Sequence, residues 1–185
     1  VIGMVSAYFG GWLDLVIQRA VDAVQAIPPL VFLLGLVIAL DPSFWAIVGA
    51  LALRSSFVLS RVIRGSVLSI RELLFIESAR ASGASSMRVI ARHILPNIMP
   101  ILVVLFSVNI AGNMIAEASL SFLGYGIQPP TPTLGGMVGG DSRLYMIVQP
   151  YLLIFPIATL ALIVLSLNLT GDLLRDHMDP RLRGR

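Results

Sequence analysis

The 185-residue sequence contains no cysteine and no lysine, and its 13 basic residues are all arginine. Without cysteine, disulfides and thiolate metal sites are excluded within this chain. A P-loop needs a lysine that reaches the β- and γ-phosphates of the nucleotide. If the protein uses ATP, another chain must therefore bind it. The two histidines, His93 and His177, argue against a histidine metal centre.

Charged residues are also scarce. They make up 12% of the sequence, whereas 57% of the residues are hydrophobic and the mean hydropathy is +0.90. A soluble domain normally carries about 25% charged residues. With so little polar surface to face water, the chain is expected to fold in a lipid bilayer.

The apolar runs predict an all-α bundle with four complete membrane spans and the end of another. Residues 1–10 supply only the end of a span, so we expect a fragment that lacks its N-terminus. A span needs about 20 apolar residues, and the amphipathic stretch 12–26 reaches that length only together with the apolar run 30–40. The other three spans are expected at about 44–63, 98–123 and 146–169.

Arginine placement predicts the orientation, because cytoplasmic loops carry the excess of positive charge. If residues 61–97 are cytoplasmic, 11 of the 13 arginines lie on that side, including those of the C-terminal tail. Arg143 is then outside, in an extracytoplasmic loop at about 124–145, and Arg54 lies within a helix.

One cytoplasmic segment carries a recognisable spacing. Residues 77–83 read Glu-Ser-Ala-Arg-Ala-Ser-Gly, and after nine more residues the chain reads His-Ile-Leu-Pro-Asn. This resembles the EAA loop of ABC importer permeases, in which Glu-Ala-Ala, three residues, Gly, nine residues and Ile-x-Leu-Pro follow one another. The matching positions are Glu77, Ala79, Gly83, Leu95 and Pro96. Ser78 and His93 depart from the pattern, and the His-Ile-Leu-Pro-Asn form is similar to the dipeptide/oligopeptide branch of that family.

Further stretches resemble the same branch. The outer-loop sequence at 116–124 and 128–132 is similar to that of the family, as are the tail at 168–183 and the opening at 8–19. Family members often have Trp where Leu134 stands and an aromatic-rich helix where Ser55 and Ser56 stand. The resemblance therefore covers nearly all of residues 1–185, as one permease domain of the type I ABC importer fold.

In such a permease the EAA loop, here about residues 64–97, forms a coupling helix that sits in a groove of the ATPase subunit. The residues themselves predict a short helix over 72–81, with Leu73, Ile76 and Ala79 on one face. Glu77 and Arg80 are three residues apart and are expected to pair on the surface. The expected ATPase-coupling residues are Glu77, Ser78, Ala79, Arg80, Gly83, Ala84, Leu95 and Pro96.

Four polar residues fall in predicted spans. Asn109, Asn113 and Glu117 are four apart and so share one helical face, and Arg54 lies about eleven residues into its helix. Such residues indicate a translocation path or an interface with a partner permease. The alternative is interhelical hydrogen bonding that only stabilises the bundle.

The resemblance implies a non-enzymatic subunit of an ATP-driven importer of di- or oligopeptides in the bacterial inner membrane. Its expected partners are a second, homologous permease, two ATP-binding subunits that hold ATP and magnesium, and an extracytoplasmic binding protein. The chain itself is expected to hold no cofactor and no metal and to bind no nucleic acid. Two alternatives remain open: the same machinery importing nickel complexes or glutathione, and a membrane channel or assembly protein without an ATPase.

Overall fold

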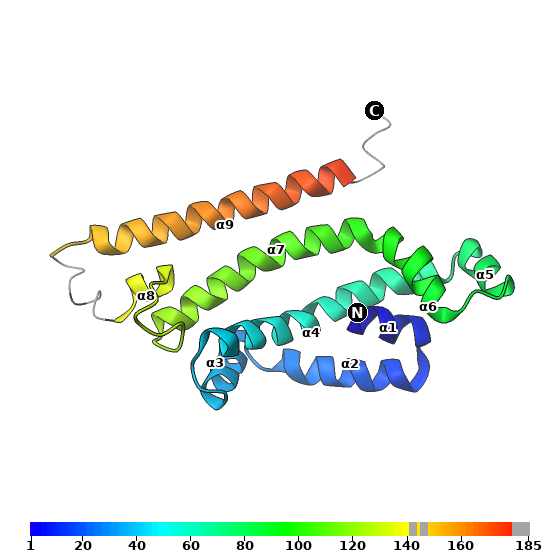
Figure 1. The fold of residues 1–185 in the computed structure, drawn as a ribbon, viewed down its shortest axis with the longest axis horizontal. Helices are drawn as coiled ribbons and strands as arrows, with labels where there is room; N and C mark the ends of the chain where they lie inside the picture. The colour runs from blue at the N-terminus through cyan, green and yellow to red at the C-terminus, as the bar shows by residue number, and fades with distance from the viewer. Residues whose placement is uncertain (141–143, 145–147, 179–185) are drawn as a thin grey trace. The chain divides into compact units, whose positions relative to one another are not determined.

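A computed structural model describes residues 1–140, 144 and 148–178, and within these residues it contains helices but no strand (Figure 1). The predicted all-α class is therefore confirmed. Three sequence predictions fall outside the described residues: the position of Arg143, the start of the last span at Met146 and the tail pattern at 179–183.

The first two helices form a tight hairpin. Helix α1 (Ile2–Phe9) and helix α2 (Gly11–Ala26) are joined by Gly10 and Gly11, whose φ angles are +66° and +57°. Only glycine adopts this conformation without steric cost, so the two glycines allow the reversal of direction. With eight residues, α1 is too short to be a complete span.

The predicted span that joins residues 12–26 to 30–40 is broken in the structure. Helix α2 ends at Ala26, and helix α3 (Pro29–Ala39) begins after Ile27 and Pro28. Pro28 has an extended ψ of 135° and lacks an N–H for helix hydrogen bonding. The stretch therefore consists of two helices with a break between them.

Helix α4 (Phe44–Arg71) begins directly after Ser43, which caps its N-terminus. Ser43 Oγ accepts a hydrogen bond from the Ala46 amide at 3.2 Å. It does not end near residue 63, as the charges that begin there suggested, but continues to Arg71. The reason is that the arginines of its last turns have partners on the first two helices, described below.

Four helical segments follow α4: α5 (Leu74–Ala81), α6 (Ser86–Val89), the π-helical turn η1 (Ile90–Ile94) and α7 (Leu95–Phe122). The last three form one continuous helix from Ser86 to Phe122. Pro96 therefore lies inside this helix, which begins well before the span predicted at about 98–123. Pro96 has no N–H to give to the carbonyl one α-turn earlier, and the π-helical turn directly before it accommodates this loss.

Beyond α7 the chain turns through residues rich in glycine and proline into the short helix α8 (Leu134–Val138), and the last described helix is α9 (Tyr151–Met178). Thr133 caps α8, since its Oγ1 accepts a hydrogen bond from the Gly136 amide at 2.9 Å. The helix of α9 extends beyond the predicted end of the span at Leu169.

Three helical segments are long and apolar enough to cross a membrane: Phe44–Arg71, Ser86–Phe122 and Tyr151–Asp176. The number among the described residues rises to four if the broken pair α2 and α3 counts as one span. These apolar helices confirm the predicted polytopic helical bundle. The fourth predicted complete span is present only if α2 and α3 are counted as one span.

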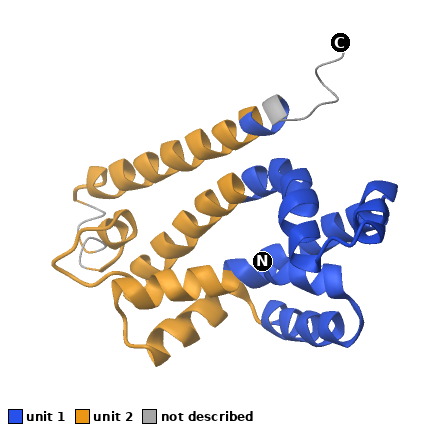
Figure 2. Ribbon diagram, turned by 45° about the vertical axis from the view of Figure 1, so that its right-hand side comes forward, with its two compact units in different colours: residues 1–26, 55–105, 174–185 blue, residues 27–54, 106–173 orange. Residues whose placement is uncertain are grey.

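The chain divides into two compact units, shown in blue and orange in Figure 2. In unit 1 (residues 1–26, 55–105 and 174–185) a core of buried side chains joins α1, the second half of α4, α5, α6 and the start of α7. In unit 2 (residues 27–54 and 106–173) a smaller core joins α3, the start of α4 and the end of α7 around Leu33, Ile47 and Leu120.

Candidate functional site

The EAA segment, which we define as residues 74–96, folds as helix α5, a tight turn and the helix that begins at Ser86. Gly83 forms the turn with a φ of +81°, a value that favours glycine. The Ala84 amide donates to the Ala79 carbonyl at 3.1 Å, and this bond closes the end of α5. The short helix predicted over 72–81 is thus present as α5, which begins two residues later at Leu74.

The inner face of the EAA segment is packed into the core of unit 1. Ile76 of α5 is fully buried, as are Val89 and Ile94 of the following helix. Ala79 and Ala84 pack partly buried against the same core. Leu73 was predicted on this face as well, but it precedes the helix and is exposed.

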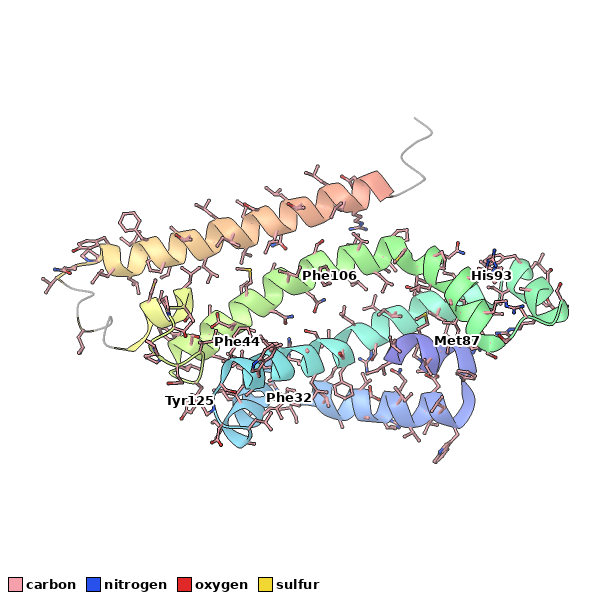
Figure 3. All side chains as sticks on the ribbon, in the orientation of Figure 1. Phe32, Phe44, Met87, His93, Phe106 and Tyr125 are labelled. Atoms are coloured by element: carbon pink, nitrogen blue, oxygen red, sulfur yellow. The ribbon has the colours of Figure 1, made fainter. Side chains whose placement is uncertain are left out.

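The outer face of the EAA segment is exposed and carries small and apolar side chains beside a few charged ones. Leu74 is 79% exposed and Met87, labelled in Figure 3, is 74% exposed. Between them six exposed residues are small: Ser78, Ala81, Ser82, Gly83, Ser85 and Ser86. The other exposed residues there are Phe75, Glu77 and Arg80. Large apolar groups beside small ones let another protein surface approach closely, so this face has the character of a docking surface.

Arg80 does not pair with Glu77, contrary to the expectation from their spacing. Its guanidinium carbon lies 4.8 Å from the centroid of the Tyr8 ring at the end of α1, which is a cation–π distance. Nearby, Arg71 Nη1 donates a hydrogen bond to the carbonyl of Ala7 at 2.7 Å. Two arginines, one at the end of α4 and one in the last turn of α5, therefore contact the C-terminal end of α1.

Two side chains of the His-Ile-Leu-Pro-Asn run, residues 93–97, make local contacts in this fold. Asn97 Nδ2 donates to the His93 carbonyl at 2.7 Å, which satisfies a backbone acceptor beside the proline. The His93 ring, half-buried, lies 6.5 Å from the ring of Phe75 on α5 (Figure 3). Leu95 and Pro96 lie at the end of the EAA segment, where the continuous helix leads into α7.

A row of polar contacts joins α2 to α4 within unit 1, and the sequence assigned no partners to these residues. Asp14 forms a two-pronged ion pair with Arg64: Nε lies 2.7 Å from Oδ1 and Nη2 lies 2.5 Å from Oδ2. Further along, Asp22 pairs with Arg61, and Gln25 Nε2 donates to the Phe57 carbonyl at 3.3 Å. We call these three contacts the α2–α4 seam.

The seam also involves α1. Ser6, which is fully buried, donates a hydrogen bond to Asp14, and Gln18 Nε2 donates to Ser6 Oγ at 3.2 Å. The Asp14 and Arg64 side chains are only 14% and 33% exposed, so their charges are partly shielded from water. A polar pocket of about 540 Å³ opens beside the seam.

Among the four polar residues predicted for a path or an interface, the structure brings two together in unit 2. Asn113 and Glu117 of α7 both line a mostly apolar cavity of about 440 Å³, together with Thr133, Leu134 and Leu160. Ser121 Oγ donates to Glu117 Oε1 at 2.6 Å. Asn109 and Arg54 do not line this cavity, and no ion pair joins Arg54 to Glu117.

In the part of the chain that the structure describes, no three His, Cys, Asp or Glu side chains lie close enough together to hold a metal ion. The outer-loop turn that precedes α8 lines a second pocket of about 370 Å³ in unit 2.

Comparison with known proteins assigns the family. Residues 1–184 match the family described as binding-protein-dependent transport system inner membrane component. The chain belongs to this family. The EAA spacing had predicted this membership, and the helical spans agree with a multi-pass membrane component.

Several relatives are similar over most of the chain. The chain is 41% identical over 177 residues, or 96% of its length, to the glutathione transport system permease protein GsiD of Shigella dysenteriae serotype 1. It is 39% identical over 182 residues, or 98% of its length, to the protein of that name from Pectobacterium atrosepticum. The matched regions cover 58% and 60% of those relatives, so the chain spans less than two thirds of their length.

As a member of this family, the chain is part of the inner membrane component of a binding-protein-dependent transport system. The sequence did not predict three contacts of the arginines: Arg80 with Tyr8, Arg71 with Ala7 and Arg64 with Asp14. A partial signal was present, because Asp14, Gln18, Asp22 and Gln25 recur on one face of α2. Only the fold shows that this face meets the arginines of α4.

Proposed function

We propose that the full-length protein is the membrane permease subunit of an ATP-driven importer. It works by alternating access: a homologous permease completes the path, and two ATPase subunits bind and hydrolyse ATP with magnesium. An extracytoplasmic binding protein delivers the substrate. This chain contributes part of the path and the element through which the ATPases act on it.

The observation that carries the proposal is that the EAA segment has one face buried in the core and one face exposed. Its inner side chains, including Ile76, Val89 and Ile94, are buried in the core that also contains α1 and α4. Its outer side leaves Leu74, Gly83 and Met87 open to a partner. A partner that moves this surface must also move the helices packed behind it, because a close-packed core transmits displacement.

The charge distribution supports an orientation with the EAA segment and the C-terminal tail on the cytoplasmic side. Arginines concentrate on that side, as the positive-inside rule requires. The ATPase subunits would then meet Leu74 and Met87 from the cytoplasm, and the turn before α8 would face the binding protein.

For the substrate, we propose a small peptide, with glutathione to be tested first. The relatives named above are glutathione permeases, which favours the alternative substrate over the general di- and oligopeptides that the sequence pattern indicated. The cavity beside Asn113 and Glu117 is mostly apolar with a few polar groups, as ligand sites usually are. We assign these two residues to the path, and Arg54 and Asn109 to the path or the permease interface.

The test is transport in liposomes that contain the full-length protein, its genomic-neighbour permease and ATPases, and the binding protein. ATP hydrolysis and uptake are measured with glutathione, then with dipeptides, for the wild type, Gly83→Arg and Gly83→Ala. Both substitutions impose the same backbone strain at a φ of +81°. Only arginine adds bulk to the proposed docking surface, where a Cβ meets nothing within 4 Å.

We expect glutathione to stimulate ATP hydrolysis and uptake in the wild type, and Gly83→Ala to retain most of both. Gly83→Arg should lose them because the ATPases no longer seat on the EAA segment, although the permeases still insert. If dipeptides stimulate uptake and glutathione does not, glutathione is not the substrate, but the proposed importer function is supported. If no ATPase associates with the wild-type permease, the protein is a channel or an assembly factor instead.

A further inference from the structure

The C-terminal end of α1 is contacted by two arginines, one at the end of α4 and one in the last turn of α5. Arg71, before α5, donates to the Ala7 carbonyl at 2.7 Å. Arg80, in the last turn of α5, lies over the Tyr8 ring at 4.8 Å. We call the Ala7 carbonyl and the Tyr8 ring, with these two arginines, the α1 anchor.

Both contacts suit the chemistry of a helix end. The last carbonyls of a helix have no partner within the helix and carry partial negative charge, which favours a cation. The face of an aromatic ring attracts a guanidinium for a similar electrostatic reason. Arg71 and Arg80 thus find two adjacent electron-rich groups on α1, and Arg80 takes the ring in place of Glu77, three residues away.

The anchor is firmly held on its α1 side. Tyr8 is 8% exposed and Ala7 is fully buried, and both belong to the core that contains Ile76 of α5. α1 itself lies close to α4, since there is no room for a Cβ between Gly3 and the backbone of Ser60. The Tyr8 ring is therefore a fixed surface against which the position of Arg80 is set.

From the anchor, a continuous line of contacts leads away from the EAA segment. α1 passes through Gly10 and Gly11 into α2. Along α2, Asp14 is held by Ser6 and Arg64, and Asp22 is held by Arg61. A displacement of α5 that moves α1 is passed to α2 and, through the seam, to α4.

We propose that the α1 anchor makes α1 the helix that receives the movement of the EAA segment. Tyr8 and Arg80 are positioning residues of this step: they act through the helices that they hold and touch no substrate. The inference rests on the proposed importer function, since it concerns how ATPase movement reaches the path.

The first experiment measures substrate taken up per ATP hydrolysed in the reconstituted importer, for Tyr8→Leu, Tyr8→Phe, Arg80→Gln and the double variant Tyr8→Leu/Arg80→Gln. Tyr8→Leu and Arg80→Gln should each lower this ratio by about two- to fivefold, the factor that one cation–π contact contributes to an equilibrium. The double variant should be no worse than the singles, because both remove one contact. Tyr8→Phe keeps the ring and should keep the ratio. Arg175→Gln, which removes an exposed arginine of α9 that contacts neither Tyr8 nor Ala7, is the charge-removal control.

The second experiment needs neither ATPase nor substrate. Hydrogen exchange of the α5 amides is measured in the membrane-embedded full-length permease, and Tyr8→Leu should raise it whereas Tyr8→Phe should not. Unchanged exchange, an unchanged uptake ratio, or equal effects of Tyr8→Leu and Tyr8→Phe would each overturn the anchor. If exchange rises but the wild-type assembly hydrolyses no ATP, the importer function fails, and the role of the anchor in coupling fails with it.

Discussion

Gly3 shows how one residue sets the approach of two helices. A Cβ at this position would overlap the carbonyl group and Cα of Ser60, so α1 and α4 lie in backbone contact there. Gly3→Ala should force the helices apart and lower the free energy of unfolding by roughly 1–3 kcal/mol, the usual cost of overpacking. Thermal unfolding of the full-length protein in detergent measures this effect.

Gly65→Ala is the matched control, since it lies on α4 in the same unit and a Cβ there meets nothing within 4 Å. In a helix interior this change should raise stability by about 0.5–1 kcal/mol, because alanine loses less entropy than glycine on folding. If both variants melt alike, the close approach at Ser60 is not what requires glycine at position 3.

The sequence predicts single residues well where the requirement is local. Gly83 lies just after the short helix predicted over 72–81, and its φ of +81° is a turn conformation that glycine adopts readily. The partner of Arg80 could not be predicted, because Glu77 was the only candidate within reach along the chain. Tyr8 competes for the guanidinium only once α1 and α5 share a core, which is a consequence of tertiary packing.

At the scale of elements, the α2–α4 seam explains why α4 runs past its apolar part. The Asp14 carboxylate is 14% exposed and is paired with Arg64. Arg64→Gln should lower the free energy of unfolding by roughly 2 kcal/mol, because a poorly hydrated carboxylate loses its charged partner. Detergent melting curves of the two single variants and the double variant Asp14→Asn/Arg64→Gln measure the coupling.

The double variant should recover much of that loss, since the neutral amides still hydrogen-bond and no charge is left without a partner. Arg88→Gln, an exposed arginine outside the seam, should change the melting temperature little. If Asp14→Asn and Arg64→Gln are simply additive in the double variant, the two groups do not stabilise the protein as a pair.

The sequence predicted the existence of the long helices better than it predicted the residues at which they begin and end. The apolar runs predicted each long helix, because hydropathy depends on composition and length alone. The extension of α4 to Arg71 and the helix start at Ser86, before Pro96, were not anticipated. Both depend on partners that satisfy charge or backbone groups: the seam for the arginines and the π-helical turn for the proline.

At the scale of the whole molecule, the membrane orientation decides which surfaces meet which partners. The proposal puts the EAA segment in the cytoplasm and the turn before α8 outside, and the arginine distribution is its physical basis. The chain has no cysteine, so a single introduced cysteine reports its own side in a full-length background without other cysteines. Ser82 and Thr131 are exposed and suit this purpose.

Thr131→Cys should react with a membrane-impermeant maleimide in intact spheroplasts, and Ser82→Cys should react only in inverted vesicles. Ala161→Cys, in the apolar part of α9, should react in neither and controls for leakage. The opposite labelling of positions 82 and 131 would place the docking surface of the EAA segment outside the cell, where no ATP-hydrolysing subunit could reach it. Labelling of both from one side would mean that the helical segments between them do not cross the membrane an odd number of times, and the span assignment of Ser86–Phe122 would have to change.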